Sequence, residues 1–350
     1  MFTFVGGWAL DKYGPKFVFL LMGIFAGLSF VLTSFVGSFS QIYFTYSLLL
    51  ATGTGYFYPV INSTISKWFD KKRGLALGIA TSGSRSGQAI FAPLSAYFIS
   101  NFGWRYAYLI TGLMIWLIVI PLSRLMKRSP QEVGAIPDGY EVKTEIQKSP
   151  GKIEIVESKG LTFTQALKSS KYWYFMPSWV FVGFANMLIY THVITYATDK
   201  NISPLSAATI MTIIGVVAIP AGILTGRLVD VMRNKILLMI FSVLLAIAIV
   251  SLIWATNLMN FYIIAGILGL CIAGIGICCA SLAVDAFGKK HIGMIMGSLD
   301  SSYAIGAAIG PLAGGLFYDN FGSYNLAFLI AGIGLITSTI LLIFFKTKSH

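Results

Sequence analysis

Two copies of one long pattern run through the chain, and this internal repeat constrains the fold more than any other feature does. Residues 7–16 read GWALDKYGPK and residues 226–235 read GRLVDVMRNK, so Gly, Asp and a final Lys recur at the same offsets. At the same spacing, KKRGLALG (71–78) returns as KKHIGMIMG (289–297), and the Asn-Phe-Gly of 101–103 returns at 320–322. The corresponding residues of the two copies lie 219 positions apart, which is far longer than the units of about 20–50 residues that build solenoids. One half of the chain therefore duplicates the other.

Composition indicates a membrane protein. The chain is 56% hydrophobic and only 11% charged, whereas soluble domains carry about 25% charged residues. A polytopic membrane protein is the class that fits these values. The cysteines, Cys271, Cys278 and Cys279, lie in one apolar stretch. We expect them to be small buried apolar residues and not a disulfide framework or a metal site.

Long apolar segments define the expected architecture. A helix needs about 20 apolar residues to cross the hydrocarbon core, and open sheet edges are not viable in lipid. The sequence therefore predicts an all-α protein with about ten full transmembrane helices and an N-terminal stub. The ten spans are 17–37, 41–66, 74–100, 104–125, 173–197, 205–226, 236–256, 260–284, 293–318 and 324–345.

The basic residues predict the orientation. All 25 lysines and arginines except Arg85, Arg105 and Lys200 lie in one alternating set of loops, and loops of this kind face the cytoplasm. We expect a multi-pass protein of the cell membrane with a cytoplasmic linker and C-terminus. Both copies of the motif then lie on the same side, as in a parallel repeat about an axis along the membrane normal. Because the net charge of +12 is spread between apolar spans, it does not indicate a nucleic-acid partner.

One long polar segment separates the two halves. Residues 127–171 are expected to form a cytoplasmic linker between an N-terminal bundle (1–126) and a C-terminal bundle (172–350). The last part of the linker, LTFTQALKSSKYW (161–173), has the pattern of a short amphipathic helix on the membrane surface.

The repeated loop pattern GxxxDxxGxK has a specific chemistry. Its glycines permit a tight turn and close helix packing. Its Asp can accept hydrogen bonds from a helix N-terminus or from a basic residue of a neighbouring helix. Contacts of this kind can hold one conformation and release in another, so we predict a gating role for both loops. The predicted gating residues are Gly7, Asp11, Gly14 and Lys16 in the first copy and Gly226, Asp230 and Lys235 in the second.

At these residues the chain resembles the major facilitator superfamily, whose helix 2–3 and helix 8–9 loops carry this pattern. The resemblance covers essentially the whole chain and implies two pseudo-symmetric bundles, with helix 5 packed on helix 8 and helix 2 on helix 11. Stretches such as RSPQEVGAIPDG (128–139) and GSLDSSYAIGAAIGPLAGG (297–315) are similar to the monocarboxylate-transporter-like and oxalate/formate exchanger branch. The resemblance implies a transporter without fixing its substrate.

Two departures from the family pattern stand out. The first motif copy begins after six residues, so we expect the chain as written to lack helix 1 and most of helix 2, and the ten spans to be helices 3–12. Anion exchangers of this kind also place basic residues in helix 8 or helix 11. Here residues 206–226 carry no charge, and helix 11 offers Asp300 and Tyr303 instead. A site with two cations is therefore not supported.

Arg85 is the first candidate for substrate contact. It lies inside the span 74–100, where a charge costs about 2.5–3.5 kcal/mol on insertion scales, so it is normally buried in the bundle and functional. Thr81, Arg85 and Gln88 share one helix face, and a guanidinium suits a carboxylate. We predict that Arg85 and Gln88 contact an anionic substrate. The alternative is that Arg85 is a structural partner for backbone carbonyls or a neighbouring helix.

Asp300, in the span 293–318, is the candidate for coupling, because a buried carboxyl group can take up and release a proton. The alternative is a pair with a cation near the cytoplasmic end. Further polar side chains inside spans are candidates for substrate binding, although such groups also bond between helices. They are Tyr58, Asn62, Asn186, Tyr190 and Tyr303.

Rows of small residues and prolines predict local geometry. The rows predict close packing and the prolines predict kinks. The rows are Gly23/Gly27, Gly83/Gly87 and Gly306/Gly310/Gly314, and the prolines are Pro59, Pro93, Pro220 and Pro311.

The sequence thus predicts a secondary transporter that moves a small organic anion, a mono- or dicarboxylate, by alternating access, as proton symport or anion exchange. One alternative is a carrier of another small solute, such as a sugar or drug. The other is a truncated membrane protein that does not transport. No nucleotide, metal or catalytic motif indicates an enzyme or a cofactor. We expect a monomer in the lipid bilayer.

Overall fold

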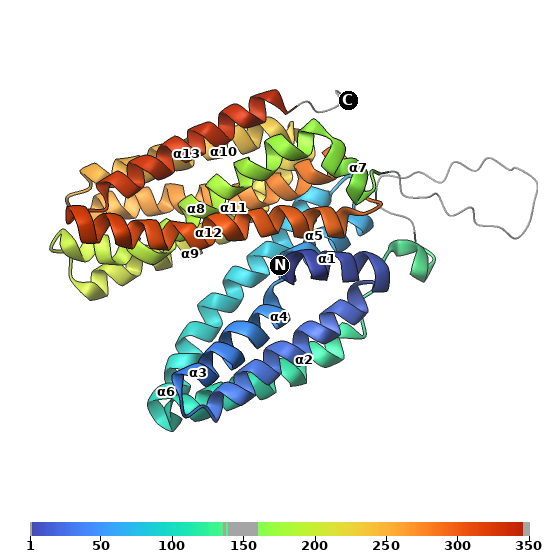
Figure 1. Cartoon of the computed structure of the whole chain (residues 1–350), viewed down its shortest axis with the longest axis horizontal. Coiled ribbons are helices and arrows are strands. Elements are labelled where there is room, and N and C mark those ends of the chain that lie inside the picture. Colours follow the sequence, from blue (N-terminus) through green and yellow to red (C-terminus); the bar gives the residue numbers. More distant parts are fainter. Residues whose placement is uncertain (1, 136–137, 139–159, 346–350) are drawn as a thin grey trace, which may run out of the picture.

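The computed structural model describes residues 2–135, 138 and 160–345, apart from the side chains at positions 2, 88, 89, 92, 93 and 96. The elements in this part of the chain are helices, with one isolated bridge between Gly160 and Gly288. They form an N-terminal bundle from α1 to α6 and a C-terminal bundle from α8 to α13 (Figure 1). The expected all-α fold with two bundles is confirmed.

The N-terminal bundle departs from the expected spans in one place. Residues 41–66 do not form one helix, because the chain leaves helical geometry between Gly55 and Tyr56. Pro59 explains the break, since it lacks an amide donor and its ring clashes with the carbonyl of the residue four positions earlier. The elements are α1 (Phe2–Tyr13), α2 (Pro15–Ser34), α3 (Phe39–Ile42), the π-helical η1 (Tyr43–Leu49), α4 (Leu50–Thr54), α5 (Phe57–Trp68) and α6 (Arg73–Ser123).

The helices of the C-terminal bundle follow the expected spans closely, whereas most of the expected linker (127–171) lies outside the described residues. The short helix predicted at the end of the linker is α7, which begins with a capping box between Thr162 and Gln165. The elements are η2 (Pro130–Val133), α7 (Phe163–Lys168), α8 (Ser170–Asp199), α9 (Pro204–Val231), α10 (Asn234–Ser251), η3 (Leu252–Trp254), α11 (Leu258–Phe287), α12 (Ile292–Phe321) and α13 (Asn325–Phe344).

Eight helices in the described residues are long and apolar enough to cross a membrane. The expected count of ten is therefore approximate. The other two expected spans are the interrupted run α3–α5 and the first part of α6. Gly103, with φ 80°, divides α6 into two helices. Gly322, at the corresponding position of the second half, has φ 66°, so the repeated Asn-Phe-Gly makes a left-handed turn in both halves.

The glycine rows pack as expected in only part of the chain. In the C-terminal bundle α12 packs on α8, and a Cβ added at Gly306 would lie 1.9 Å from the Val180 carbonyl oxygen. Gly27 packs in the same manner on Trp116. The prediction for Gly83 and Gly87 is wrong, because a Cβ at either position meets no described atom within 4 Å.

The two bundles meet at one end and their ribbons diverge from it (Figure 1). We call this end the linker side, because residues 127–135, 138 and 160–168 lie there. Most of the contacts run between α1 and α12 and between α6 and α9, which are the helix pairs implied by the family resemblance, and fewer run between α5 and α12 and between α6 and α11. The bundles therefore touch mainly through the helices that carry the repeated motif.

Candidate functional site

The first repeated loop reaches the N-terminus of α12. Asp11 Oδ1 accepts a hydrogen bond from the Gly293 amide at 3.3 Å, and Oδ2 accepts one from the Met294 amide at 2.8 Å. A helix N-terminus attracts negative charge through its free amides and its dipole. Lys67 Nζ lies 3.4 Å from Asp11 Oδ1. Burial lowers the pKa of the Lys67 ammonium, and Asp11 opposes that shift. We call this arrangement the first cap.

The second repeated loop makes the same contacts in the opposite direction. Asp230 Oδ1 accepts a hydrogen bond from the Gly74 amide at 2.6 Å, and Oδ2 accepts one from the Leu75 amide at 3.0 Å. Gly74 and Leu75 occupy the positions that correspond to Gly293 and Met294 in the repeat. Each bundle thus supplies a carboxylate to a helix N-terminus of the other. We call this arrangement the second cap.

The motif glycines allow the helix backbones to touch between the bundles. A Cβ added at Gly7 would lie 2.2 Å from the Gly293 carbonyl oxygen, and one at Gly226 would lie 2.3 Å from the Gly74 carbonyl oxygen. Gly14 has a different role, since its φ of 84° is a left-handed conformation immediately before α2. Each motif glycine therefore has a structural reason, either a close crossing or a turn.

The final lysines of the two motif copies do not have equivalent surroundings. Lys16 is exposed and forms no ion pair with any described residue. Lys235 Nζ instead donates to the carbonyl oxygens of Ile343 at 2.9 Å and Phe345 at 2.8 Å. It therefore binds the carbonyl end of α13.

Ionic contacts that the motif did not predict also cross between the bundles. Arg73 forms an ion pair with Asp285 and donates to Ser281 Oγ at 2.9 Å. Lys289 Nζ lies 3.1 Å from Asp70 Oδ1. The repeat contains no signal for the Arg73 pair, because the position corresponding to Arg73 is Ile292.

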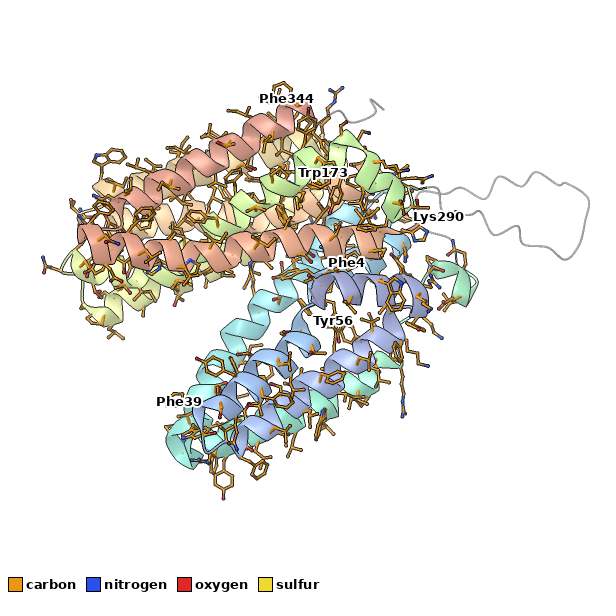
Figure 2. All side chains as sticks on the ribbon, viewed as in Figure 1. Phe4, Phe39, Tyr56, Trp173, Lys290 and Phe344 are labelled. Carbon is orange, nitrogen blue, oxygen red and sulfur yellow. The ribbon has the colours of Figure 1, made fainter. Side chains whose placement is uncertain are left out.

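The described parts of the linker are bound to both bundles. Asp138 accepts hydrogen bonds from the amides of Asp70 and Lys72, the second at 2.7 Å. The Leu161 amide donates to the Phe287 carbonyl oxygen at 2.8 Å. Phe163 of α7 packs on Phe4, with ring centroids 5.3 Å apart, where α1 meets the C-terminal bundle (Figure 2).

A group of polar and aromatic side chains lies between α8 and α12, inside the C-terminal bundle. Trp179 Nε1 donates to Asp300 Oδ1 at 3.3 Å, and its ring lies 5.4 Å from that of Tyr303. Asn186 Nδ2 donates to the Tyr303 hydroxyl at 3.4 Å. Asp300 Oδ2 and Asn186 Oδ1 are buried and have no hydrogen-bond partner among the described residues. Three predicted residues are thus adjacent, and two of their acceptor atoms are unsatisfied.

Candidates from the N-terminal bundle approach the same face of α8. The Tyr190 hydroxyl is close enough to Arg85 of α6 and to Tyr58 of α5 to interact with both electrostatically. Arg85 is half-buried, and Tyr58 is 53% exposed. Asn62 is buried in α5 and has no hydrogen bond to another candidate in the described structure. The Gln88 side chain lies outside the described residues. Arg85 and Tyr58 of the N-terminal bundle thus lie within electrostatic range of Tyr190 of the C-terminal bundle.

Trp179 was not among the predicted site residues. The sequence contains a signal for it, because Trp179 precedes Asn186 by seven residues, which is two helical turns and the same face. Arg85 and Asp300 do not form an ion pair with each other among the described residues.

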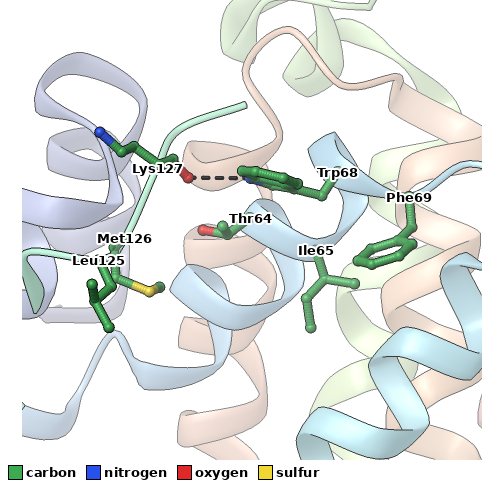
Figure 3. Close-up of a pocket in the computed structure, with 7 residues that line it drawn as sticks. All are labelled: Thr64, Ile65, Trp68, Phe69, Leu125, Met126 and Lys127. Carbon is green, nitrogen blue, oxygen red and sulfur yellow. Dashed lines mark hydrogen bonds between the residues drawn. The ribbon is translucent and has the colours of Figure 1, made fainter. Parts of the chain in front are cut away.

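A pocket of about 230 Å³ lies elsewhere, on the linker side of the N-terminal bundle (Figure 3). Trp68 Nε1 donates to the Lys127 carbonyl oxygen across it at 3.2 Å. Its lining is largely apolar and contains no predicted site residue. It consists of Thr64, Ile65, Trp68, Phe69, Leu125, Met126 and Lys127.

Comparison of the sequence with known families gives a match along the whole chain. The profile described as Major Facilitator Superfamily matches residues 1–279 and again residues 235–350. Monocarboxylate transporter 13 of Rattus norvegicus is 24% identical over 341 residues, covering 97% of this chain and 75% of the relative. Monocarboxylate transporter 12-B of Danio rerio is 26% identical over 356 residues, covering 95% of this chain and 73% of the relative.

The fold is also similar to those of solved transporter structures. The E. coli fucose:proton symporter has a TM-score of 0.73 at 15% identity, with 99% of this chain and 88% of the symporter covered. The human organic anion transporter MFSD10 has a TM-score of 0.68 at 16% identity, with 97% of this chain and 80% of the transporter covered. At these identities the likeness shows the fold alone.

Proposed function

Because the chain belongs to the major facilitator superfamily, and is therefore a multi-span membrane transporter and not an enzyme, we propose that it carries a small organic anion. The substrate is a mono- or dicarboxylate, and it moves by alternating access, as proton symport or anion exchange. Arg85 binds the substrate carboxylate, and Asp300 carries the charge that couples transport to a proton.

The position of Arg85 supports the substrate class most directly. It is a half-buried cation on α6 whose neighbours include Tyr190 of α8 and Tyr58 of α5. A guanidinium away from bulk water binds a carboxylate through two charge-assisted hydrogen bonds, and phenol hydroxyls add donors around it. The names of the relatives, monocarboxylate transporters 13 and 12-B, are consistent with this substrate class.

We assign to the two caps the stabilisation of one conformation in the transport cycle, the state that is closed on the linker side. Asp11 and Asp230 hold the bundles together on the linker side through amides of α12 and α6. In the opposite state these hydrogen bonds are broken and the linker side opens. The bundles of residues 1–126 and 172–350 then move relative to each other, and the linker 127–171 connects them.

Topology follows from the same proposal. Since the linker side carries almost all of the basic loops, we assign it to the cytoplasm, together with the C-terminus. The protein is a monomer of the cell membrane in this assignment.

The test is uptake of labelled lactate, formate and oxalate into proteoliposomes that contain the purified chain. Arg85→Ala should raise the half-saturating concentration at least about tenfold, because a charge-assisted hydrogen bond is worth about 1.5–3 kcal/mol. Arg124→Ala, which removes an exposed arginine at the C-terminal end of the second helix of α6, is the control. Uptake of a neutral or cationic solute without uptake of any of the three anions contradicts the proposal.

A further inference from the structure

Two buried acceptor atoms lie near the proposed substrate site without a donor. Asn186 is 5% exposed, and its Oδ1 has no hydrogen-bond partner among the described residues. Asp300 Oδ2 is also buried and without a partner there. A buried acceptor left unsatisfied costs about 1–3 kcal/mol, and more when it is charged. The part of the site that contains Asn186 and Asp300 therefore lacks hydrogen-bond donors and positive charge among the described residues.

Positive charge is instead present toward Tyr190, farther along the same face of α8, because Arg85 acts there. Trp179, Asn186 and Tyr190 are spaced by seven and four residues, so they follow one face of α8. Trp179 donates to Asp300, and Tyr190 is the residue of this face on which the charge of Arg85 acts. Asn186 lies one turn from Tyr190, which is about 6 Å along the axis. A positive end and a negative end thus lie in order along α8.

The groups around Asp300 do not neutralise it. The described side chains that interact with it are Trp179 of α8, Cys279 of α11 and, on its own helix α12, Tyr303. None of these side chains is a cation. The rings of Trp179 and Tyr303 present π-faces, which attract organic cations.

We propose that the preferred substrate is a zwitterion in which several bonds separate the two charges. Its carboxylate binds Arg85, and its protonated nitrogen donates to Asn186 Oδ1 and faces the Asp300 carboxylate. The proposal rests on the function proposed above and specifies the substrate class of the same site. An ω-amino carboxylate has this form, since its charges lie at opposite ends of a short chain.

The proposal has a consequence for coupling. A plain carboxylate brings only negative charge, so a proton must accompany it to occupy Asp300. A zwitterion brings its own positive charge, so Asp300 is satisfied without a proton. The same carrier should therefore move protons with one substrate class and none with the other.

Two matched series test the proposal in proteoliposomes that contain the full chain. The first series is glycine, β-alanine, 4-aminobutyrate and 6-aminohexanoate, and the second is acetate, propionate, butyrate and hexanoate, all labelled. We expect initial uptake at low concentration to favour the amino compound at least about tenfold at the longer chain lengths, as a hydrogen bond to a charged group predicts. After subtraction of the signal from protein-free vesicles, which records passive entry of the undissociated acid, a pH-sensitive dye inside the vesicles should report acidification with butyrate and none with 4-aminobutyrate.

Asp300→Asn should abolish the advantage of the amino compounds, and Asp319→Asn, an exposed position on the same helix, should preserve it. The wild-type series needs no variant, so a variant that fails to fold does not remove the test. Equal uptake of both series in the wild type overturns the zwitterion proposal and leaves Arg85-dependent carboxylate transport intact. Failure of both series overturns the zwitterion proposal, and the function proposed above falls with it only if lactate, formate and oxalate are not taken up either.

Discussion

The Asp230 carboxylate accepts a hydrogen bond from the Gly74 amide at 2.6 Å, across the contact between the two bundles. Asp11 does the same for α12, from the other bundle. Each bundle therefore depends on the other to complete a helix N-terminus. Opening on the linker side must expose both helix ends together.

Asp230→Asn should shift the equilibrium toward the state that is open on the linker side. The substitution removes the charge that complements the α6 N-terminus, and such a charge is worth about 0.3–1 kcal/mol, or up to about 2 kcal/mol where it is partly buried, which corresponds to a shift of about 2- to 30-fold. The readout is cross-linking between cysteines at Thr3 and Ser301, whose hydroxyl oxygens lie 2.6 Å apart across the contact. The buried native cysteines are first replaced by alanine.

In this experiment Asp11→Asn should lower the cross-linking yield to a similar extent, and the double variant further still. Asp319→Asn should leave the yield unchanged, because that carboxylate is exposed and distant from both caps. An unchanged yield in the double variant would show that the caps do not stabilise the closed linker side.

Gly74→Ala should prevent full closure on the linker side. The added Cβ would lie 2.2 Å from the Gly226 carbonyl oxygen, which requires the helices to separate. We expect transport to fall at least about tenfold, with little change in thermal stability, because alanine favours the helix. Gly266→Ala is the matched control, since its Cβ meets no described atom within 4 Å. Equal transport by the two variants would contradict the close crossing.

Reversal of the Arg73–Asp285 pair should show whether it acts across the bundles. Arg73→Glu alone and Asp285→Arg alone each place like charges together and should lower the cross-linking yield between positions 3 and 301. The double variant restores opposite charges and should recover most of the yield, so the coupling in a double-mutant cycle is the quantity to measure. Additive losses would mean that the pair contributes nothing to closure.

Trp179→Phe should lower the thermal unfolding midpoint. The ring that packs on Tyr303 is retained, but the donor to Asp300 Oδ1 is lost, so both carboxylate oxygens are left without a described partner. We expect the free energy of unfolding to fall by about 1–3 kcal/mol. Trp254→Phe, at a 69% exposed tryptophan, should leave the midpoint unchanged and serves as control. Equal unfolding midpoints for the two variants would contradict a stabilising hydrogen bond from Trp179 to Asp300.

The sequence predicted the parts of the fold that depend on local pattern and on the repeat. The apolar spans became helices, and the aligned residues Asp11, Asp230, Gly74 and Gly293 became two reciprocal caps. Alignment succeeded here because backbone amides serve as donors whatever side chain they carry. The pairing of Arg73 with Asp285 could not be predicted, because it depends on side chains at positions where the two halves differ.

The contacts within the candidate site could not be predicted from the sequence either, because they depend on which side chains the fold brings together. Polar residues within spans identified Asp300, Asn186 and Tyr190, but nothing in the sequence indicated that Trp179 would donate to Asp300. The break before α5 was also larger than the kink expected at Pro59. The roles assigned to Arg85 and the other candidates stay predictions until transport is measured.

The glycine crossings have a consequence for how fast the two bundles can part. At Gly226 the nearest atoms of the facing helix belong to the backbone of Gly74 and Leu75, and at Gly74 they are the Gly226 carbonyl oxygen and the side chains of Val229 and Asp230. Few side chains there therefore have to change rotamer when the surfaces separate. The crossing should thus add little friction to the motion, and it offers a single register in which the surfaces fit when they return.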